Sequence, residues 1–239
     1  MADIILNCDL GENEPLARTA QFLSLIDAAN IACGVHAGNP EKTQATIKLA
    51  LQYQVAIGIH PGLPSAGGRG PCSLTAHEFK RLLEVQVGAF QALAARLGTC
   101  AEYVKLHGSL YHAVETQPAL ATVYIDFLLR QSPKLAVMAL AHGRLAARAE
   151  AAGIRVLHEA FADRDYLSDG SLVPRDEPGA VFTAPEACAR LTRWQQSGKW
   201  PTRDGAAISL LADTLCVHGD SPDALELVQK LRTWIDHTK

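Results

Sequence analysis

The chain has 239 residues, of which 48% are hydrophobic and 20% charged, so it is long enough to bury a sizeable core without disulfides. A net charge of -3 and 22 scattered Lys and Arg residues exclude the basic stripe with which proteins neutralise a nucleic-acid backbone. The sequence shows neither a secretory signal nor an apolar run of membrane-spanning length. We therefore expect one domain over residues 1–239, with neither nucleic acid nor a membrane as partner.

The six cysteines are far apart in the sequence and form no CxxC pair. They are Cys8, Cys33, Cys72, Cys100, Cys188 and Cys216. Most of them lie inside apolar stretches, which is typical of buried thiols that stay reduced. This usage predicts a cytoplasmic protein.

Short apolar runs alternate with longer helical patterns along the whole chain, and this alternation predicts βα units around a parallel sheet. The predicted strands cover residues 4–8, 30–33, 55–59, 103–106, 135–140, 154–157 and 214–217. Seven such units predict an α/β fold, a single (βα)7 TIM-like barrel slightly smaller than the eight-stranded form.

Several local signals mark where the helices begin and end. Residues 75–78 and 183–186 both read as capping boxes, and Gly98 stands where the helix that follows residue 75 should end. Asn39-Pro40 and Ser221-Pro222 each place a proline at an expected first helical position. Residues 163–178 carry no period and hold several Gly and Pro residues, so we expect a long ordered loop there.

Polar side chains follow the predicted strands, at the points where the strands end. They are Asp9, Glu12, His36, His60, Lys105, His107, His142, Asp163, Arg164, His218 and Asp220. In a parallel barrel these positions open onto one face, where barrels of this kind place their active sites. The sequence therefore predicts one site built from nearly every strand, with Arg175 of the irregular loop beside it.

Each of these residues also has a structural interpretation. For His142 we favour a simple hydrogen bond to the backbone, and His77, His112 and His237 are expected on helix surfaces. For Glu12, capping of the following helix is a serious alternative to a role in the site. Asp9 stands directly at a strand end, and for this residue we favour a functional role.

The basic residues leave two interpretations open. Lys105 lies inside an apolar run and either extends to the rim or holds an anionic group of a substrate. Arg164 and Arg175 fit a salt-bridge network about as well as they fit anion binding.

Several nucleotide and hydrolase motifs are missing from the sequence. It contains no GxxxxGK[ST], no GxGxxG after a strand, no HExxH and no GxSxG. A standard P-loop ATPase, dinucleotide chemistry and a serine-nucleophile hydrolase are therefore disfavoured, and flavin, NAD and haem are not expected.

Read in order, the strand-end motifs resemble the LamB/YcsF family. The motifs are NCDLGE at 7–12, ANIACGVHAG at 29–38, HPG at 60–62, FADR at 161–164, DGSLVPR at 169–175 and DTLCVHGD at 213–220. They span essentially the whole chain. The resemblance implies a barrel similar to the glycoside hydrolase/deacetylase superfamily, acting as the A subunit of a prokaryotic 5-oxoprolinase.

The resemblance implies that 5-oxo-L-proline is opened to L-glutamate while ATP, with Mg²⁺, is hydrolysed to ADP and phosphate, together with subunits B and C. Lys105, Arg164 and Arg175 would then stabilise a phosphoryl group. Asp9, His36 and His218 remain alternatives for the general base. Whether the chain also forms a homo-oligomer stays open.

Two other functions compete with this one. Asp9, His36 and His60 are the residue types of an open catalytic metal site, which would make the protein a metal-dependent hydrolase of a small cyclic amide. A noncatalytic subunit of the B and C complex is the other alternative, although so many polar strand ends argue against a pure scaffold.

Overall fold

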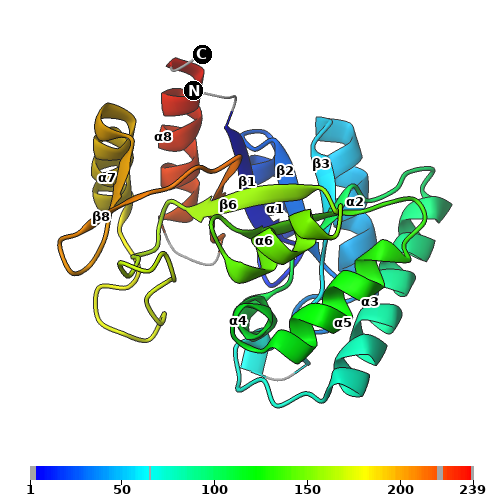
Figure 1. Cartoon of the computed structure of the whole chain (residues 1–239). Coiled ribbons are helices and arrows are strands. Elements are labelled where there is room, and N and C mark those ends of the chain that lie inside the picture. The colour runs from blue at the N-terminus through cyan, green and yellow to red at the C-terminus, as the bar shows by residue number, and fades with distance from the viewer. Residues whose placement is uncertain (1–3, 65, 220–222, 238–239) are drawn as a thin grey trace.

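A computed structural model of the chain describes residues 4–64, 66–219 and 223–237. Seven parallel strands close into a barrel in the order β1-β2-β3-β4-β5-β6-β9 (Figure 1). Their bounds are Ile5–Leu10, Ala28–Ala32, Ala56–His60, Tyr103–Val104, Ala136–Leu140, Val156–Phe161 and Thr214–Val217. Every predicted strand falls on one of these strands, so the predicted seven-stranded α/β barrel is confirmed.

The strand register fixes which side chains meet at the end of the barrel. Asp9 of β1 lies opposite Asn30 of β2, and Cys8 of β1 lies opposite Val217 of β9. Phe161 at the end of β6 pairs with Cys216 of β9, which completes the closure. The carboxyl ends of all seven strands therefore open onto one face.

Helices surround the barrel on the outside (Figure 1). Those that the structure describes are α1 Leu16–Leu23, α2 Pro40–Tyr53, α3 Ala76–Arg96, α4 Gly108–Thr116, α5 Pro118–Leu129, α6 Arg144–Ala151, α7 Ala184–Ser197 and α8 Ala224–His237. No helix in this part of the chain is both long and apolar enough to cross a membrane.

The predicted helix signals are present where the structure describes them. The Thr75 hydroxyl accepts the Glu78 N–H at 3.2 Å while the Glu78 carboxylate accepts the Thr75 N–H at 2.8 Å. In the box that begins at Thr183, the Glu186 carboxylate likewise accepts the Thr183 N–H at 2.8 Å. Asn39 caps α2, and Gly98 follows α3 with φ 74°. The signal at 221–222 lies outside the described residues.

The segment between β6 and α7 is the long loop that the sequence predicts, held by two isolated bridges rather than by strands. A hairpin that was not predicted follows α7, in which β7 (Lys199–Pro201) pairs antiparallel with β8 (Ala207–Ser209). Each of its strands has three residues, too few for a hydrophobic period to reveal them.

The barrel interior changes from apolar to polar along its axis. A small cluster of Ala28, Tyr103, Ala136, Met138 and Leu157 fills one level. Gly58 makes room for the Tyr103 ring, because a Cβ at this position would lie 2.1 Å from the ring. Towards the carboxyl ends of the strands the buried side chains become polar or charged, and this level carries the site.

Candidate functional site

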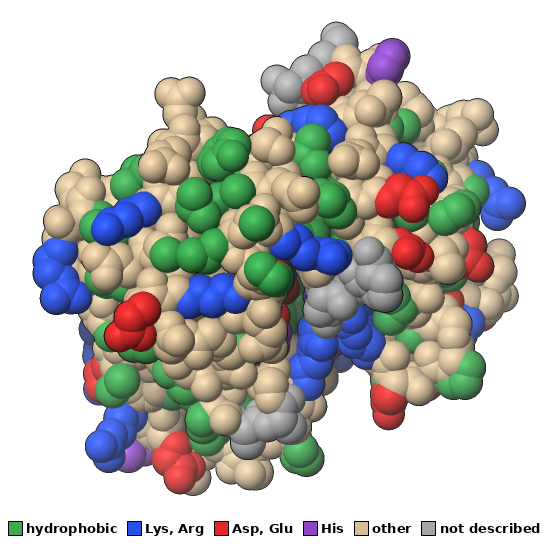
Figure 2. Space-filling model, turned by 180° about the vertical axis from the view of Figure 1, so that it is seen from behind, with side chains coloured by type: hydrophobic (Ala, Val, Ile, Leu, Met, Phe, Trp, Pro, Cys, Tyr) green, Lys and Arg blue, Asp and Glu red, His purple; other side chains and the backbone are tan. Residues whose placement is uncertain are grey.

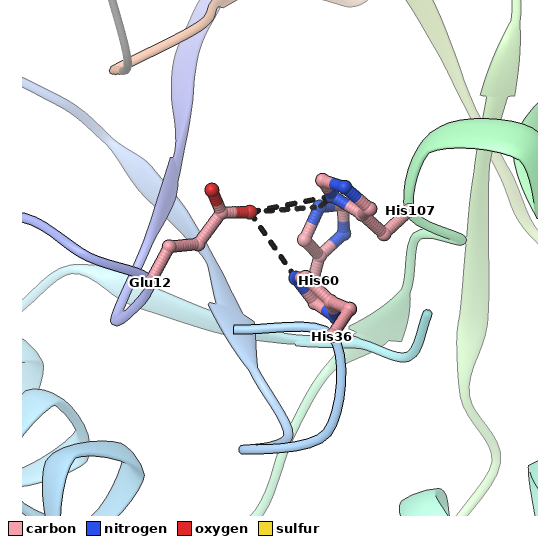
Figure 3. Close-up of side chains that lie close together, drawn as sticks. All are labelled: Glu12, His36, His60 and His107. Carbon is pink, nitrogen blue, oxygen red and sulfur yellow. Dashed lines mark hydrogen bonds and ion pairs between the residues drawn. The ribbon is translucent and has the colours of Figure 1, made fainter. Parts of the chain in front are cut away.

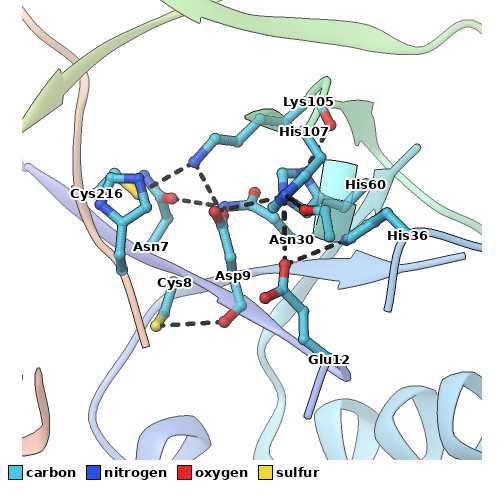
Figure 4. A network of polar contacts seen from close by, with 12 residues as sticks. Asn7, Cys8, Asp9, Glu12, Asn30, His36, His60, Lys105, His107 and Cys216 are labelled. Carbon is cyan, nitrogen blue, oxygen red and sulfur yellow. Dashed lines mark hydrogen bonds and ion pairs between the residues drawn. The ribbon is translucent and has the colours of Figure 1, made fainter. Parts of the chain in front are cut away.

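A chain of buried hydrogen bonds forms the floor of the site (Figure 4). The Tyr103 hydroxyl donates to the Asn30 side-chain oxygen at 2.8 Å, and the Asn30 amide donates to Asn7 at 2.7 Å and to Asp9 at 2.8 Å. Asn7 in turn donates to the Thr214 hydroxyl at 2.7 Å. Because rigid strands carry every member, the Asp9 carboxylate is held in one orientation.

Lys105, directly after β4, lies at the centre of the site with 2% of its surface exposed. Its Nζ is 3.0 Å from Asp9 Oδ1, 2.8 Å from Glu159 Oε1 and 3.1 Å from Cys216 Sγ. Burial acts to lower the pKa of Lys105, but the surrounding anionic groups outweigh it and raise that pKa well above its usual value. Of the two interpretations left open for Lys105, the one in which it extends to the rim is wrong, because the side chain is buried and paired.

Glu159 is a buried acid that the sequence interpretation missed. It lies inside β6 with none of its surface exposed, and burial raises its pKa although Lys105 acts in the opposite direction. Asp9 differs: burial would raise its pKa, but His60 and Lys105 hold it well below the usual range. Of the two carboxyl groups beside Lys105, Asp9 is therefore firmly ionised, and Glu159 holds a proton more readily.

Three histidines converge on Glu12 on the other side of Asp9 (Figure 3). Glu12 Oε1 lies 3.2 Å from His36 Nε2, 3.3 Å from His107 Nδ1 and 4.0 Å from His60 Nε2. The His36 and His107 rings stack with centroids 4.0 Å apart. Glu12 faces the histidines and does not cap α1, so the helix-cap interpretation is wrong.

Backbone carbonyls fix the outer nitrogens of two of these rings. His60 Nδ1 lies 2.8 Å from the Lys105 carbonyl oxygen, and His107 Nε2 lies 3.0 Å from the Gly67 carbonyl oxygen. The inner nitrogens, His60 Nε2 and His107 Nδ1, are 2.9 Å apart. Gly68 lets the loop pass this close, since a Cβ there would lie 2.4 Å from the His107 ring.

Asp163 follows β6 and His218 follows β9, and the two form a second pair at the pocket. Asp163 Oδ2 lies 3.0 Å from His218 Nδ1 and accepts the His218 backbone N–H at 3.2 Å. Burial would raise the pKa of Asp163, but His218 lowers it. The His218 ring stacks on Phe161, with centroids 5.5 Å apart. An ionised carboxylate therefore sets the orientation of His218.

These groups surround a pocket of about 620 Å³. Its lining includes Lys105 and three arginines, Arg69, Arg164 and Arg175. Arg164 also donates to the carbonyls of Val173 and Ala180, so it ties down the loop and lines the pocket at once. The space-filling view in Figure 2 shows Lys and Arg side chains gathered beside a hollow in the face that is turned to the viewer.

The structure brings together most of the residues predicted for the site. Asp9, His60, Lys105, His107, Arg164, Arg175 and His218 line the pocket. Glu12, His36 and Asp163 contact lining residues. Asp220 lies outside the described residues. The sequence interpretation missed Glu159, Arg69, Asn7 and Asn30. Glu159 lies beyond residue 157, where the predicted strand ended.

The other histidines for which the sequence made a prediction lie where it placed them, and one of them also reaches the pocket. His142 Nε2 accepts the Leu211 N–H at 3.2 Å, as the backbone interpretation predicts. His77 and His237 are exposed on their helices. His112 is also exposed on α4, but it lies at the pocket lining.

Comparison with known proteins now identifies the family. The chain matches the LamB/YcsF family over residues 4–239. It belongs to that family. Among curated relatives, a protein of Heliobacterium modesticaldum that is named as the A subunit of 5-oxoprolinase is 39% identical over 98% of this chain and 94% of its own length. The protein of the same name from Pyrococcus abyssi is 40% identical over 95% of this chain and 91% of its own length.

Among solved structures, the lactam utilization protein from Thermus thermophilus superposes with a TM-score of 0.89. The two chains are 32% identical, and the match covers all of this chain and 97% of the other. The barrel and its surrounding helices are therefore shared by this LamB/YcsF protein and a solved structure across their whole lengths.

Proposed function

We propose that this LamB/YcsF protein is the A subunit of an ATP-dependent 5-oxoprolinase that opens 5-oxo-L-proline to L-glutamate. The observation that carries the proposal is similarity over nearly the whole chain to relatives that bear the name of this subunit. The name of the Thermus protein, which refers to lactam utilization, agrees with a cyclic amide as substrate.

The pocket supports a small anionic substrate. Its volume of about 620 Å³ falls within the range of about 300–1,000 Å³ that is usual for small-molecule sites. 5-Oxoproline carries one carboxylate, and guanidinium groups bind carboxylates in a bidentate manner. Arg69 and Arg175 in the lining offer this chemistry to the carboxylate or to a transferred phosphoryl group.

The proposed reaction activates the ring amide by phosphorylation. The amide oxygen forms a bond to the γ-phosphorus of ATP while the bond from that phosphorus to the bridging oxygen breaks and ADP leaves. Water then adds to the ring carbon, the carbon–nitrogen bond breaks, and the nitrogen takes a proton. These events leave the side-chain carboxyl group of glutamate as an acyl phosphate. A second water adds to its carbonyl carbon and the bond from that carbon to the phosphate oxygen breaks, so the products are L-glutamate, ADP and phosphate. Buried cations stabilise the charge that develops on the phosphoryl oxygens.

His218 is the best-placed general base of the three residues considered. Asp9 Oδ1 already accepts from Asn30 and Lys105, and His36 Nε2 is directed at Glu12. His218 instead presents Nδ1 to Asp163, which leaves Nε2 to take a proton from water, as a carboxylate-oriented histidine does in hydrolases.

ATP, with Mg²⁺, and subunits B and C complete the proposal. Without a P-loop in this chain, nucleotide binding needs another arrangement here or on a partner. A partner that closes the pocket would also protect a phosphorylated amide from premature contact with water.

The test is reconstitution with purified subunits. Phosphate release and glutamate formation are measured together for the chain alone and for every combination with B and C, with and without 5-oxoproline. We expect coupled products only with the full set. Glutamate from the chain alone without ATP would instead show a simple hydrolase, and an inert full mixture would contradict the substrate assignment.

A further inference from the structure

The inner nitrogens of His60 and His107 face each other although neither carries a proton in the neutral ring. The outer nitrogen of each ring points at a backbone carbonyl, which can only accept, so each outer nitrogen must be the N–H. The inner nitrogens then both hold lone pairs, and they lie 2.9 Å apart. Two lone pairs at this distance repel unless a positive charge lies between them.

The surrounding groups add lone pairs and no proton. Asp9 Oδ2 lies 3.3 Å from His60 Nε2, and Glu12 Oε1 lies 3.3 Å from His107 Nδ1. A single proton bridges only two acceptor atoms, whereas a metal ion contacts all the inner nitrogens and the Glu12 oxygen at once.

The distances agree with one ion bound at the centre of the cluster. Metal bonds to histidine and carboxylate of about 2.0–2.1 Å in a tetrahedron place neighbouring ligand atoms about 3.3 Å apart. The contacts that join Glu12, His36, His60 and His107 measure 2.9, 3.2, 3.3 and 4.0 Å and lie around this value. Figure 3 shows the three rings directed at one carboxylate oxygen.

We propose that Glu12, His36, His60 and His107 hold one divalent transition-metal ion. Three imidazoles and one carboxylate suit zinc, cobalt, iron or manganese, whereas Mg²⁺ prefers oxygen ligands and water. The carbonyls of Lys105 and Gly67 act as the outer groups that orient metal-binding histidines.

This ligand set differs from the sequence prediction of Asp9, His36 and His60. It keeps the two histidines and adds Glu12 and His107, while Asp9 lies beside the cluster, held by Lys105 and Asn30. Because His60 and His107 line the pocket, a metal there would polarise a bound carbonyl or acidify a water. The metal assignment rests on the geometry of the cluster. It adds a metal site to the proposed function, but it does not depend on that function being correct.

The test measures metal binding on the full chain alone, without ATP, 5-oxoproline or partners. Protein freed of metal by a chelator is titrated with Co²⁺, whose visible absorption reports coordination by nitrogen and oxygen, and with Zn²⁺ against a competing dye. Glu12→Gln and His107→Asn remove one ligand each. His112→Asn is the matched control, since His112 lines the same pocket outside the cluster.

We expect one equivalent of metal in the wild type and in His112→Asn, with binding weakened on the order of 100-fold in the two ligand variants. Bound metal should raise the melting temperature of the wild type and not that of Glu12→Gln. Absence of stoichiometric binding in the folded wild type, or unchanged affinity in Glu12→Gln, would overturn the assignment. Glu12→Gln keeps the side-chain shape and decides the case if His107→Asn does not fold.

Discussion

The histidines on the two sides of the pocket are oriented by different kinds of partner. After β3 and β4, His60 and His107 each give their outer N–H to a backbone carbonyl, and their inner nitrogens face further acceptors. After β9, His218 instead directs Nδ1 at the Asp163 carboxylate. The first arrangement turns ring lone pairs towards one another, as in a metal site, and the second orients one ring through a carboxylate, as for a general base.

Lys105 lies between the two sides, and its removal is expected to have the largest effect. Lys105→Met leaves Asp9 and Glu159 buried without their cation, which should lower the free energy of unfolding by about 3–5 kcal/mol and abolish turnover. Urea denaturation measures this loss. Lys80→Met is the control, because its pair with Glu84 is exposed and should contribute less than about 1 kcal/mol. Equal stability of the two variants would contradict the central role of Lys105.

The second prediction separates the two sides directly. His218→Asn should lower turnover of the reconstituted enzyme by about 10²–10⁴-fold, the usual contribution of a general base, and leave Co²⁺ binding unchanged. His107→Asn should instead weaken Co²⁺ binding. Steady-state rates and the cobalt titration are measured on both variants. If His218→Asn kept normal turnover, the base assignment would fail, and if it lost the metal, the two sides would not be independent.

The fold was predictable because it depends on local patterns that repeat. Seven apolar runs, the capping boxes at Thr75 and Thr183 and the cap at Asn39 all appear where the sequence indicates them. The β7–β8 hairpin was missed because strands of three residues carry no readable period.

The site was predictable as a set of residues but not as a set of contacts. Residues such as His36 and His107 could be chosen because they follow strands, yet their grouping depends on ring directions that the sequence does not encode. Glu159 shows the other limit: a buried acid inside a strand resembles an exposed one until its partner, Lys105, is placed in space. The Lys105 rim interpretation failed for the same reason.

The third prediction concerns the loop on the His218 side. Asp165 is buried and accepts from Arg190 at 3.2 Å and from Arg203 at 3.1 Å, which ties the loop to α7 and the hairpin. Asp165→Asn should cost about 2 kcal/mol through weaker charged hydrogen bonds and raise KM more than it lowers kcat. Asp169→Asn, in an exposed part of the same loop, is the control. Unchanged KM with lowered stability would limit Asp165 to a purely structural role.

The smallest effects are expected from the two capping boxes, which provide a matched pair on the two sides of the molecule. Thr75→Ala removes a cap from α3, and Thr183→Ala does the same for α7, directly after the loop that carries Arg164. Each should lower the free energy of unfolding by about 1 kcal/mol, and Thr→Ser at either position should restore it, because serine caps equally well. Urea denaturation of the four variants measures both effects.

Turnover and metal binding of the same variants show how firmly each side of the pocket is held. Both should stay at wild-type levels in Thr75→Ala, since exposed Thr75 bonds to Glu78 of its own helix and not to a member of the Glu12 cluster. If Thr183→Ala lowers turnover while Thr75→Ala does not, the loop position on the His218 side depends on the start of α7, and that side is the less rigid one. Equal turnover in both variants at equal stability loss would show that both sides are held by the barrel alone.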